Sequence, residues 1–288
     1  MFVVAGATGQ TGAAVAQTLL SRGQPVRVLV RNEQKAAVWK DKGAELCVAE
    51  LGDPSALAQA LDGARGAYLL VPPCYGTEDP NAAACAVVDA MVSALQTSKV
   101  PELVVLSSIG AQHSEKTGPI IPCHYAEEQL STLTETRVTF LRSAYFMENF
   151  KNFMAAIKGQ GVLPVLSSAS RRMAMVSVQD IGRLTSDILI EGTRAHQVLE
   201  VSGPTEQSFD DVAALFAEAL GSPVKTAQVH ESKIVATLTS IGMPPSTAAL
   251  YREMALAVEA GLVAFEGGSV RQVRGTTRIE DAVRMLAS

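Results

Sequence analysis

The chain opens with three glycines at three-residue spacing, placed between an apolar run and a segment of helical character. Gly6, Gly9 and Gly12 follow the apolar residues 2–5, and apolar residues then recur at helical spacing over 13–20. This order predicts a buried strand, a tight turn and a helix N-terminus. The free N–H groups and the positive dipole end of such a helix suit the pyrophosphate of a dinucleotide. We therefore expect the following residues to bind a dinucleotide: Gly6, Thr8, Gly9, Gln10, Thr11 and Gly12.

Each glycine has a separate purpose in this prediction. Gly6 permits the sharp turn, Gly9 lets the backbone approach a phosphate, and Gly12 lets the helix pack tightly on the strand. The alternative is an ordinary strand-to-helix turn, because three spaced glycines alone are a weak signal.

Length and composition favour one nucleotide-binding sheet with a smaller appendage. The 288 residues are 48% hydrophobic and 18% charged, so a large core is available, and the net charge is −5. With no basic cluster, helix-turn-helix or zinc motif, we expect no nucleic-acid partner and no metal. We expect reduced thiols, since no CxxC pair occurs among Cys47, Cys74, Cys85 and Cys123.

The sequence also bears on where the protein is located. The first expected strand begins at residue 2, which leaves no room for a cleavable signal peptide. The weakly charged stretch 81–97 contains Asp89 and is too short to span a bilayer. We expect a soluble, cytoplasmic protein without a membrane partner.

Strand-like and helix-like segments alternate over residues 1–150. This alternation predicts an α/β fold of the Rossmann type, a doubly wound parallel sheet with its ligand at the carboxyl ends of the strands. Residues 151–288 break the rhythm and predict a smaller, mostly helical substrate lobe with strands that return to the main sheet. Within it, Ser208 and Asp211 predict a helix cap. Expected strands cover 2–5, 25–30, 45–48, 67–71, 103–107 and 138–141, and expected helices cover 12–22, 33–42, 54–62, 81–98 and 122–135.

The end of the second strand indicates which dinucleotide is bound. NAD-specific folds place an acid about 20 residues beyond the glycines, to bind the ribose 2′-hydroxyl. Here Arg31 ends the strand, and no acid occurs before Glu33. A guanidinium pairs with a 2′-phosphate, so NADP(H) is favoured over NAD(H), the alternative being an exposed edge arginine. Lys35 is a weaker second cation, and Asp53 either faces the adenine amino group or caps the following helix.

Several stretches together resemble the NmrA-like group of atypical short-chain dehydrogenases. The resemblance implies a Rossmann domain with strand order 3-2-1-4-5-6-7 and a cleft between this domain and the C-terminal lobe. Among members, bacterial NAD(P)H-dependent quinone or azo reductases are nearest in style, whereas others are cofactor-binding redox sensors. Besides the strand that ends in Arg31, the stretches are Gly6–Gly12, Ala49–Asp53, Val104–Ala111, Thr139–Asn149, Val178–Ile181 and Val201–Pro204.

The proton donor of a standard short-chain dehydrogenase is incomplete in this chain. Those enzymes use a Ser after the fifth strand and a Tyr-x-x-x-Lys pair. Ser107 and Ser108 stand at the first place and Tyr125 at the second, but Gln129 replaces the lysine. Glutamine carries no positive charge, so nothing evident helps Tyr125 to ionise. Ketone reduction is therefore disfavoured.

The resemblance also offers a histidine near this position. His124 matches it, with Glu127 or Glu128 as the accompanying acid, although the lysine usual between them is missing. The alternative is a helix-cap or surface histidine. The candidate catalytic residues are thus Tyr125, His124 and Ser108, and Ser107 is expected to contact the cofactor.

Quinone and azo acceptors need a flat apolar slot beside the nicotinamide more than a strong acid. The segment after the fourth strand crosses the cofactor, and its two prolines fix an extended turn. Aromatic residues after the sixth strand line the slot or, alternatively, belong to the core. Candidate cofactor contacts are Val71, Pro72, Pro73 and Tyr145, and candidate acceptor contacts are Tyr75, Phe146, Asn149 and Phe150.

Two functions of different class follow. The first is an NADPH-dependent oxidoreductase that donates hydride to a quinone-like or azo acceptor. The second is a non-catalytic NADP-binding redox sensor that acts through a regulatory protein partner. A third possibility is isomerase, epimerase or aryl-substrate reductase activity in a biosynthetic pathway. The enzyme is favoured slightly, because the chain has no extra docking segment. The sequence leaves open whether the protein forms a homodimer.

Overall fold

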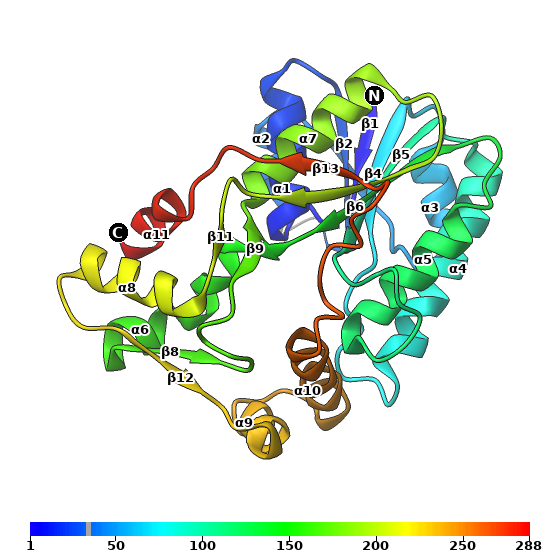
Figure 1. Cartoon of the computed structure of the whole chain (residues 1–288). Helices are drawn as coiled ribbons and strands as arrows, with labels where there is room; N and C mark the ends of the chain where they lie inside the picture. Colours follow the sequence, from blue (N-terminus) through cyan, green and yellow to red (C-terminus); the bar gives the residue numbers. More distant parts are fainter. Residues whose placement is uncertain (33–35) are drawn as a thin grey trace.

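The computed structural model describes residues 1–32 and 36–288. Glu33 and Lys35 lie outside the described residues, so the predicted second cation is not placed. Within the described part, eight parallel strands form one sheet, in the order β13-β10-β6-β5-β4-β1-β2-β3 (Figure 1). These strands are β1 (Phe2–Val4), β2 (Val26–Val30), β3 (Glu45–Val48), β4 (Gly66–Leu70), β5 (Glu102–Ser108), β6 (Arg137–Ser143), β10 (Gln197–Ser202) and β13 (Arg271–Arg274).

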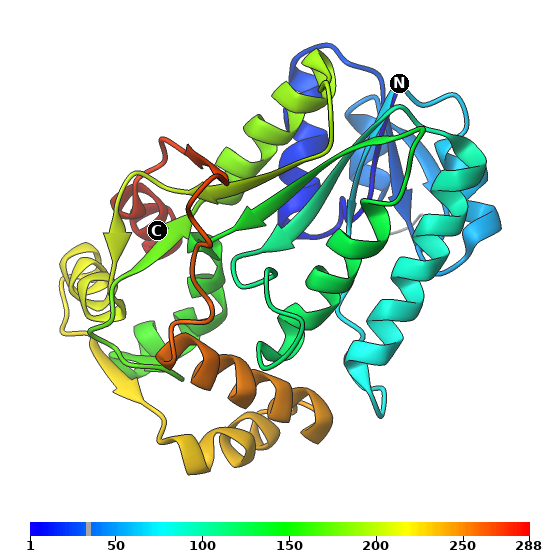
Figure 2. The ribbon, with the colours of Figure 1, turned by 45° about the vertical axis from the view of Figure 1, so that its right-hand side comes forward.

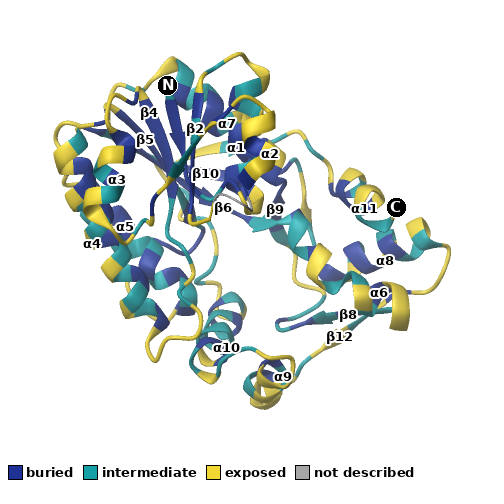
Figure 3. Ribbon diagram, turned by 180° about the vertical axis from the view of Figure 1, so that it is seen from behind, coloured by how far each residue is buried: buried dark blue, intermediate teal, exposed yellow. Residues whose placement is uncertain are grey.

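The Rossmann-type order expected from the family resemblance is confirmed and extended. With β10 as the seventh strand, the order reads as expected, and β13 adds one more strand at the edge. The central strands are continuous apolar runs because helices cover both faces of the sheet (Figure 3). One face carries α1 (Gln10–Ser21), α2 (Ala37–Asp41) and α7 (Val178–Glu191), and the other carries α3 (Pro54–Leu61), α4 (Pro80–Ser98) and α5 (Ile121–Leu130).

Close packing around α1 depends on two glycines. A Cβ on Gly12 would lie 2.3 Å from the carbonyl oxygen of Ala5, which confirms the tight contact predicted between helix and strand. A Cβ on Gly182 of α7 would lie 2.8 Å from the backbone of Ala14. Any side chain at either position would push α1 away from its neighbours.

The small lobe contains two small sheets as well as helices, and it lies at the end of the main sheet away from the N-terminus (Figure 2). The capping box predicted for Ser208 and Asp211 is confirmed. Its strands are β7 (Tyr145–Phe146), β9 (Met173–Val176) and β11 (Glu206–Gln207) in one sheet, and β8 (Val162–Val165) with β12 (Lys225–Gln228) in the other. Its helices are α6 (Met154–Gln160), α8 (Phe209–Leu220), α9 (Ile234–Ser240), α10 (Pro245–Glu259) and α11 (Ile279–Ala287).

The core of the small lobe decides between the two alternatives for Phe150, an acceptor contact or a core residue. Phe150 is fully buried, and its ring lies 6.0 Å from that of Phe209 and 6.1 Å from that of Phe216. Since no part of its side chain is exposed, Phe150 is a core residue and not an acceptor contact.

The main sheet takes elements from both halves of the chain. From the part beyond residue 150, α7 packs on α1, and β10 and β13 extend the sheet next to β6. The backbone thus passes repeatedly between the sheet and the small lobe (Figure 1). Among the described residues, no helix combines the length and apolar character needed to span a bilayer.

Candidate functional site

The glycine loop leaves the N-terminus of α1 open. Gly6 has φ +67°, a conformation that favours glycine, and this confirms the predicted sharp turn. Gly9 is the N-cap residue, no side chain caps the helix, and no acid occurs in its first turn. Thr8, Gly9 and Gln10 are exposed. The first N–H groups of α1 therefore face outward with the positive end of the helix dipole, which suits an anion.

A tryptophan that no sequence motif singles out supports this loop. The buried indole of Trp39 donates a hydrogen bond to the carbonyl oxygen of Ala7, with 3.0 Å between the two atoms. The ammonium of Lys42 lies 4.8 Å from the centre of the Trp39 ring. Helix α2 thereby fixes the loop from the side of β2. The only signal in the sequence is that this is the chain's single tryptophan.

Arg31 lies at the carboxyl end of β2, and β2 is the hydrogen-bonded neighbour of β1. Its side chain is exposed, and it forms no ion pair with any residue in the ranges 1–32 and 36–288. The carboxylate of Asp53 accepts hydrogen bonds from the amides of Ser55 and Ala56, both at 3.0 Å. Asp53 therefore caps α3, and its contact with adenine stays a prediction.

A buried ionic network lies below the carboxyl ends of β5 and β6. The hydroxyl of Ser107 donates to Oε1 of Glu127 at 2.5 Å, and the guanidinium of Arg142 lies 2.6 Å from Oε2 of the same carboxylate. Arg142 also pairs with Glu266, a residue of the small lobe's return segment. Burial alone would lower the pKa of Arg142. The carboxylates of Glu127 and Glu266 together have a larger effect, so the pKa is raised. Ser107 thus uses its hydroxyl inside the protein, and its contact with a cofactor stays a prediction.

The three candidate catalytic side chains point in different directions. The hydroxyl of Tyr125 donates to Asp89 of α4 at 2.7 Å, and this hydrogen bond raises the pKa of Tyr125. His124 contacts the carbonyl oxygen of Ala111 through Nδ1 at 2.8 Å, so it faces the loop after β5. The hydroxyl of Ser108 donates to the carbonyl of Ile109 at 2.9 Å. The structure does not bring Tyr125 and Ser108 together as a proton-donating pair.

The segment after β4 reaches the small lobe. The hydroxyl groups of Tyr75 and Tyr251 are 2.6 Å apart, and Ser246 donates to the carbonyl of Thr77 at 2.9 Å. Burial is the main cause that raises the pKa of Tyr251, and the neighbouring Tyr75 raises it further. These contacts join α10 to the segment that contains three predicted cofactor contacts. Of these three, Val71 and Pro72 are half-buried and Pro73 is exposed.

The residues after β6 form a short strand and a 3-10 helix (Met147–Phe153). The ring of Tyr145 lies 5.7 Å from that of Phe209, and its hydroxyl interacts with Asn149. Burial raises the pKa of Tyr145. Phe146 is half-buried and packs against the core of the main sheet. Tyr145 and Asn149 are therefore close together, while their contacts with cofactor and acceptor stay predictions.

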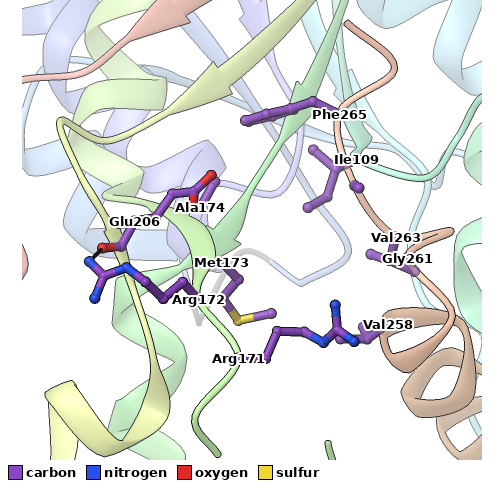
Figure 4. Close-up of a pocket in the computed structure, with 11 residues that line it drawn as sticks. Ile109, Arg171, Arg172, Met173, Ala174, Glu206, Val258, Gly261, Val263 and Phe265 are labelled. Atoms are coloured by element: carbon purple, nitrogen blue, oxygen red, sulfur yellow. Dashed lines mark hydrogen bonds between the residues drawn. The ribbon is translucent and has the colours of Figure 1, made fainter. Parts of the chain in front are cut away.

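A small cavity of about 120 Å³ opens beside the end of β5 (Figure 4). Its walls combine apolar residues, among them Ile109, Met173 and Phe265, with the charged Arg171, Arg172 and Glu206. Arg171 lies along one side and donates to the carbonyl of Glu259 at 2.9 Å. Arg172 is held by Asp211 and by the carbonyl of Glu206. Sequence reasoning missed this cavity, because its walls come from the loop after β5, from β9 and from residues 258–265. Within the described residues, no cluster of three or more possible metal ligands occurs.

Comparison with known proteins places the chain in a family. The sequence profile of the NmrA-like family matches residues 1–263. The chain belongs to the NmrA-like family.

Its relatives include reductases of several kinds. The chain is similar to an NAD(P)H azoreductase of Xenophilus azovorans, with 26% identity over 88% of this chain and 86% of the relative. It is similar to quinone oxidoreductase 2 of Escherichia coli (strain K12), with 23% identity over 99% and 98% of the two chains.

Two solved structures share the fold over the whole chain. One is a triphenylmethane reductase of Citrobacter sp., with a TM-score of 0.82, 21% identity and 99% coverage of both chains. The other is an NADPH-dependent quinone oxidoreductase of Escherichia coli in complex with NADPH, with a TM-score of 0.82, 21% identity and 100% coverage of both chains. At these identities, the structures show that this NmrA-like chain has the same fold.

Proposed function

We propose that this NmrA-like chain is an NADPH-dependent oxidoreductase that transfers hydride to a quinone-like acceptor, or to an azo acceptor. The observation that carries the proposal is the uncapped N-terminus of α1 with the exposed Arg31 at the end of the adjacent strand β2. The two reductase relatives support the same reaction class.

The chain's own groups fit a phosphorylated dinucleotide. The loop Gly6–Gly9 and the first turn of α1 offer N–H groups to a pyrophosphate, and Trp39 fixes the loop through the Ala7 carbonyl. Arg31 offers a forked pair of N–H donors to a 2′-phosphate, and in the described part of the chain no ion pair competes for them. NADPH, when bound, supplies the hydride.

The acceptor would lie in the cavity beside β5. Ile109 directly follows Ser108, the last residue of β5, so this cavity begins at the carboxyl end of the sheet where a Rossmann fold binds its ligand. The apolar side chains of Ile109, Met173 and Phe265 offer a surface against which a flat ring would lie. A quinone accepts charge over its whole ring system, so the reaction does not depend on the Tyr-x-x-x-Lys donor that this chain lacks.

Anaerobic mixing of the protein with NADPH or NADH and a panel of quinones and azo dyes tests the proposal. We expect absorbance at the nicotinamide band to fall steadily with at least one quinone, and faster with NADPH than with NADH. Tight binding of NADPH without oxidation by any acceptor would overturn the enzymatic proposal and favour the redox sensor. Failure to bind either dinucleotide would overturn both.

A further inference from the structure

We propose that the hydroxyl of Tyr251 in α10 donates a hydrogen bond to an oxygen of the quinone acceptor, and that Tyr75 in turn donates to Tyr251. This inference rests on the proposed function and adds a catalytic residue to the same site. Three features of the structure carry it: the place of the two tyrosines, a hydroxyl proton that the protein does not use, and the firm seat of α10.

The two tyrosines meet beside the carboxyl ends of the central strands. β4 and β2 lie on opposite sides of β1, so the strand order reverses there, and a Rossmann fold binds its ligand at such a point. Tyr75 belongs to the segment after β4, and its hydroxyl lies 2.6 Å from that of Tyr251. Tyr251 thus reaches, from 176 positions along the chain, the edge of the sheet where the proposed reaction takes place.

Helix α10 carries Tyr251 and part of the cavity beside β5 on the same side. Val258 lines that cavity. Tyr251 comes seven residues earlier, which is about two turns of an α-helix, so both side chains lie on one face of α10. Tyr145, which follows β6, lies close enough to Tyr251 to add to the rise in its pKa, after burial and Tyr75. Side chains from α10 and from the ends of β4 and β6 therefore converge.

The pair has one hydroxyl proton that the protein does not use. Each hydroxyl holds a single proton, and the hydrogen bond between Tyr75 and Tyr251 takes one of the two. Within residues 1–32 and 36–288, neither hydroxyl has another hydrogen-bond partner. Tyr75 is 50% exposed, whereas Tyr251 is half-buried. Water therefore satisfies Tyr75 easily, and a ligand gains more from the shielded proton of Tyr251.

A hydroxyl in this place suits the charge that forms on a reduced quinone. Transfer of hydride from NADPH yields NADP⁺ and a hydroquinone monoanion, whose negative charge lies on an oxygen, and a proton from water completes the hydroquinone. A donor that is already in place stabilises this charge as it develops. Burial is the main cause that raises the pKa of Tyr251, so its hydroxyl keeps its proton and remains a donor.

Helix α10 is seated firmly, which gives the donor a defined position. A Cβ on Gly118, in the 3-10 turn before α5, would lie 2.1 Å from the carbonyl oxygen of Leu250, the residue before Tyr251. The hydroxyl of Ser246 donates to the carbonyl of Thr77 at 2.9 Å, close to Tyr75 in the chain. The backbone of α10 is therefore held from two directions, and the hydroxyl needs no rearrangement when charge appears on the acceptor.

Two substitutions separate a donor from a purely structural link. Tyr251→Phe and Tyr75→Phe remove the same hydrogen bond between the two rings, so both should lower the free energy of unfolding equally. Only Tyr251→Phe also removes the donor to the acceptor. We expect it to lower kcat/KM for duroquinone by about 10- to 100-fold, the worth of a hydrogen bond to a charged group, and Tyr75→Phe to lower it by less than about threefold. Equal losses of kcat/KM would overturn the inference.

A complex that cannot react gives a direct readout of the contact. Duroquinone and NADP⁺ are both oxidised, so no hydride passes between them, and the fully substituted ring does not add to thiols. A hydrogen bond weakens the C=O bond. In infrared spectra, a carbonyl band of duroquinone should therefore lie at lower wavenumber in the native complex than in the Tyr251→Phe complex, and Tyr75→Phe should keep the lowered band.

The same complex distinguishes this inference from the proposed function. In Tyr251→Phe, Kd for duroquinone should rise by about fivefold to tenfold, which is less than the loss of kcat/KM because the charge grows only during the reaction. An unshifted band in the native protein, or no binding of duroquinone, would overturn the inference whatever the turnover. A lowered band that depends on Tyr251, without oxidation of NADPH by any quinone, would uphold the hydrogen bond and overturn only the proposed function.

Discussion

The Ala7 carbonyl and the Trp39 indole are 32 positions apart in the chain and 3.0 Å apart in the structure. A buried carbonyl that loses its donor costs more than the hydrogen bond itself is worth. The shape of the glycine loop therefore depends on a residue outside it. The turn at Gly6 and the close contact at Gly12 are predictable from the sequence, because both depend on local backbone geometry. The partner of the Ala7 carbonyl is not, because it depends on how α2 packs.

The Trp39→Phe substitution should weaken NADPH binding while kcat with a quinone changes little. The reason is that the phenyl ring keeps most of the packing but leaves the Ala7 carbonyl without its donor. The expected loss is about fivefold to tenfold in affinity, equivalent to roughly 1 kcal/mol. Titration that follows NADPH fluorescence measures it, with Val38→Ala, an exposed position of the same helix, as the control. Unchanged affinity would show that the loop holds its shape without the indole.

The Arg31→Asp substitution should reverse the preference between the two coenzymes. A carboxylate repels the 2′-phosphate and can accept a hydrogen bond from a ribose hydroxyl. We expect NADPH affinity to fall by about 10- to 100-fold, the worth of a hydrogen bond to a charged group, and NADH affinity to hold or rise. Calorimetric titration with both coenzymes measures the change. The matched control is Arg194→Asp, an exposed arginine in the loop before β10; equal effects of the two variants would refute the assignment of Arg31.

At the scale of elements, the capping box of α8 was predictable because all its groups lie within four residues. The side chain of Ser208 accepts the amide of Asp211 at 3.0 Å, and the carboxylate of Asp211 accepts the amide of Ser208 at 2.9 Å. The contact between α1 and α7 was not predictable, because Ala14 and Gly182 are about 170 positions apart. Nothing in the sequence around Gly182 distinguishes it from other glycines in helices.

The cap makes a stability prediction with a definite pH dependence. The hydrogen bonds from Ser208 lower the pKa of Asp211 below its usual value. Asp211 therefore stabilises the fold above about pH 4, and this contribution is lost as the pH falls through the lowered pKa. Urea unfolding of Asp211→Asn should show a cost at pH 7 that shrinks toward pH 2, and Ser208→Ala should cost about 1 kcal/mol at pH 7. A cost for Asp211→Asn that is independent of pH would contradict the assignment.

The Gly182→Ala substitution should destabilise the protein by about 1–3 kcal/mol, the usual cost of overpacking. Its methyl group would meet the backbone of Ala14, which cannot move without shifting α1. In Gly159→Ala, also within a helix, the methyl group meets nothing within 4 Å and should stabilise by about 0.5–1 kcal/mol. Thermal and urea unfolding compare the two. Equal stability of both variants would show that α7 is free to move away from α1.

At the scale of the whole molecule, both parts predicted from the sequence, residues 1–150 and 151–288, contribute strands to the main sheet. Helix α7 covers the same face as α1, and β10 pairs with β6 through the register Leu199↔Leu141. Without these elements β6 would be an exposed edge strand, and the core cluster that α1 shares with Ile181 and Leu189 of α7 would be incomplete.

A fragment of residues 1–150 should consequently not fold on its own. We expect it to aggregate or to lack a cooperative unfolding transition, whereas the complete chain should unfold cooperatively. Circular dichroism and sedimentation of the purified fragment check this outcome. A monomeric fragment that unfolds cooperatively and binds NADPH would show that the boundary near residue 150 separates independent domains.

The sequence by itself determined the alternating strands and helices, the turn at Gly6 and the place of Arg31, because each depends on neighbours a few residues away. Only the tertiary structure decided that Ser107 bonds to Glu127, that Phe150 lies in the core, and that Val263 and Phe265 line a cavity beside β5. The physical reason is that buried polar groups and core side chains take whichever partners the packing brings near, and local propensity does not encode which distant residues those are.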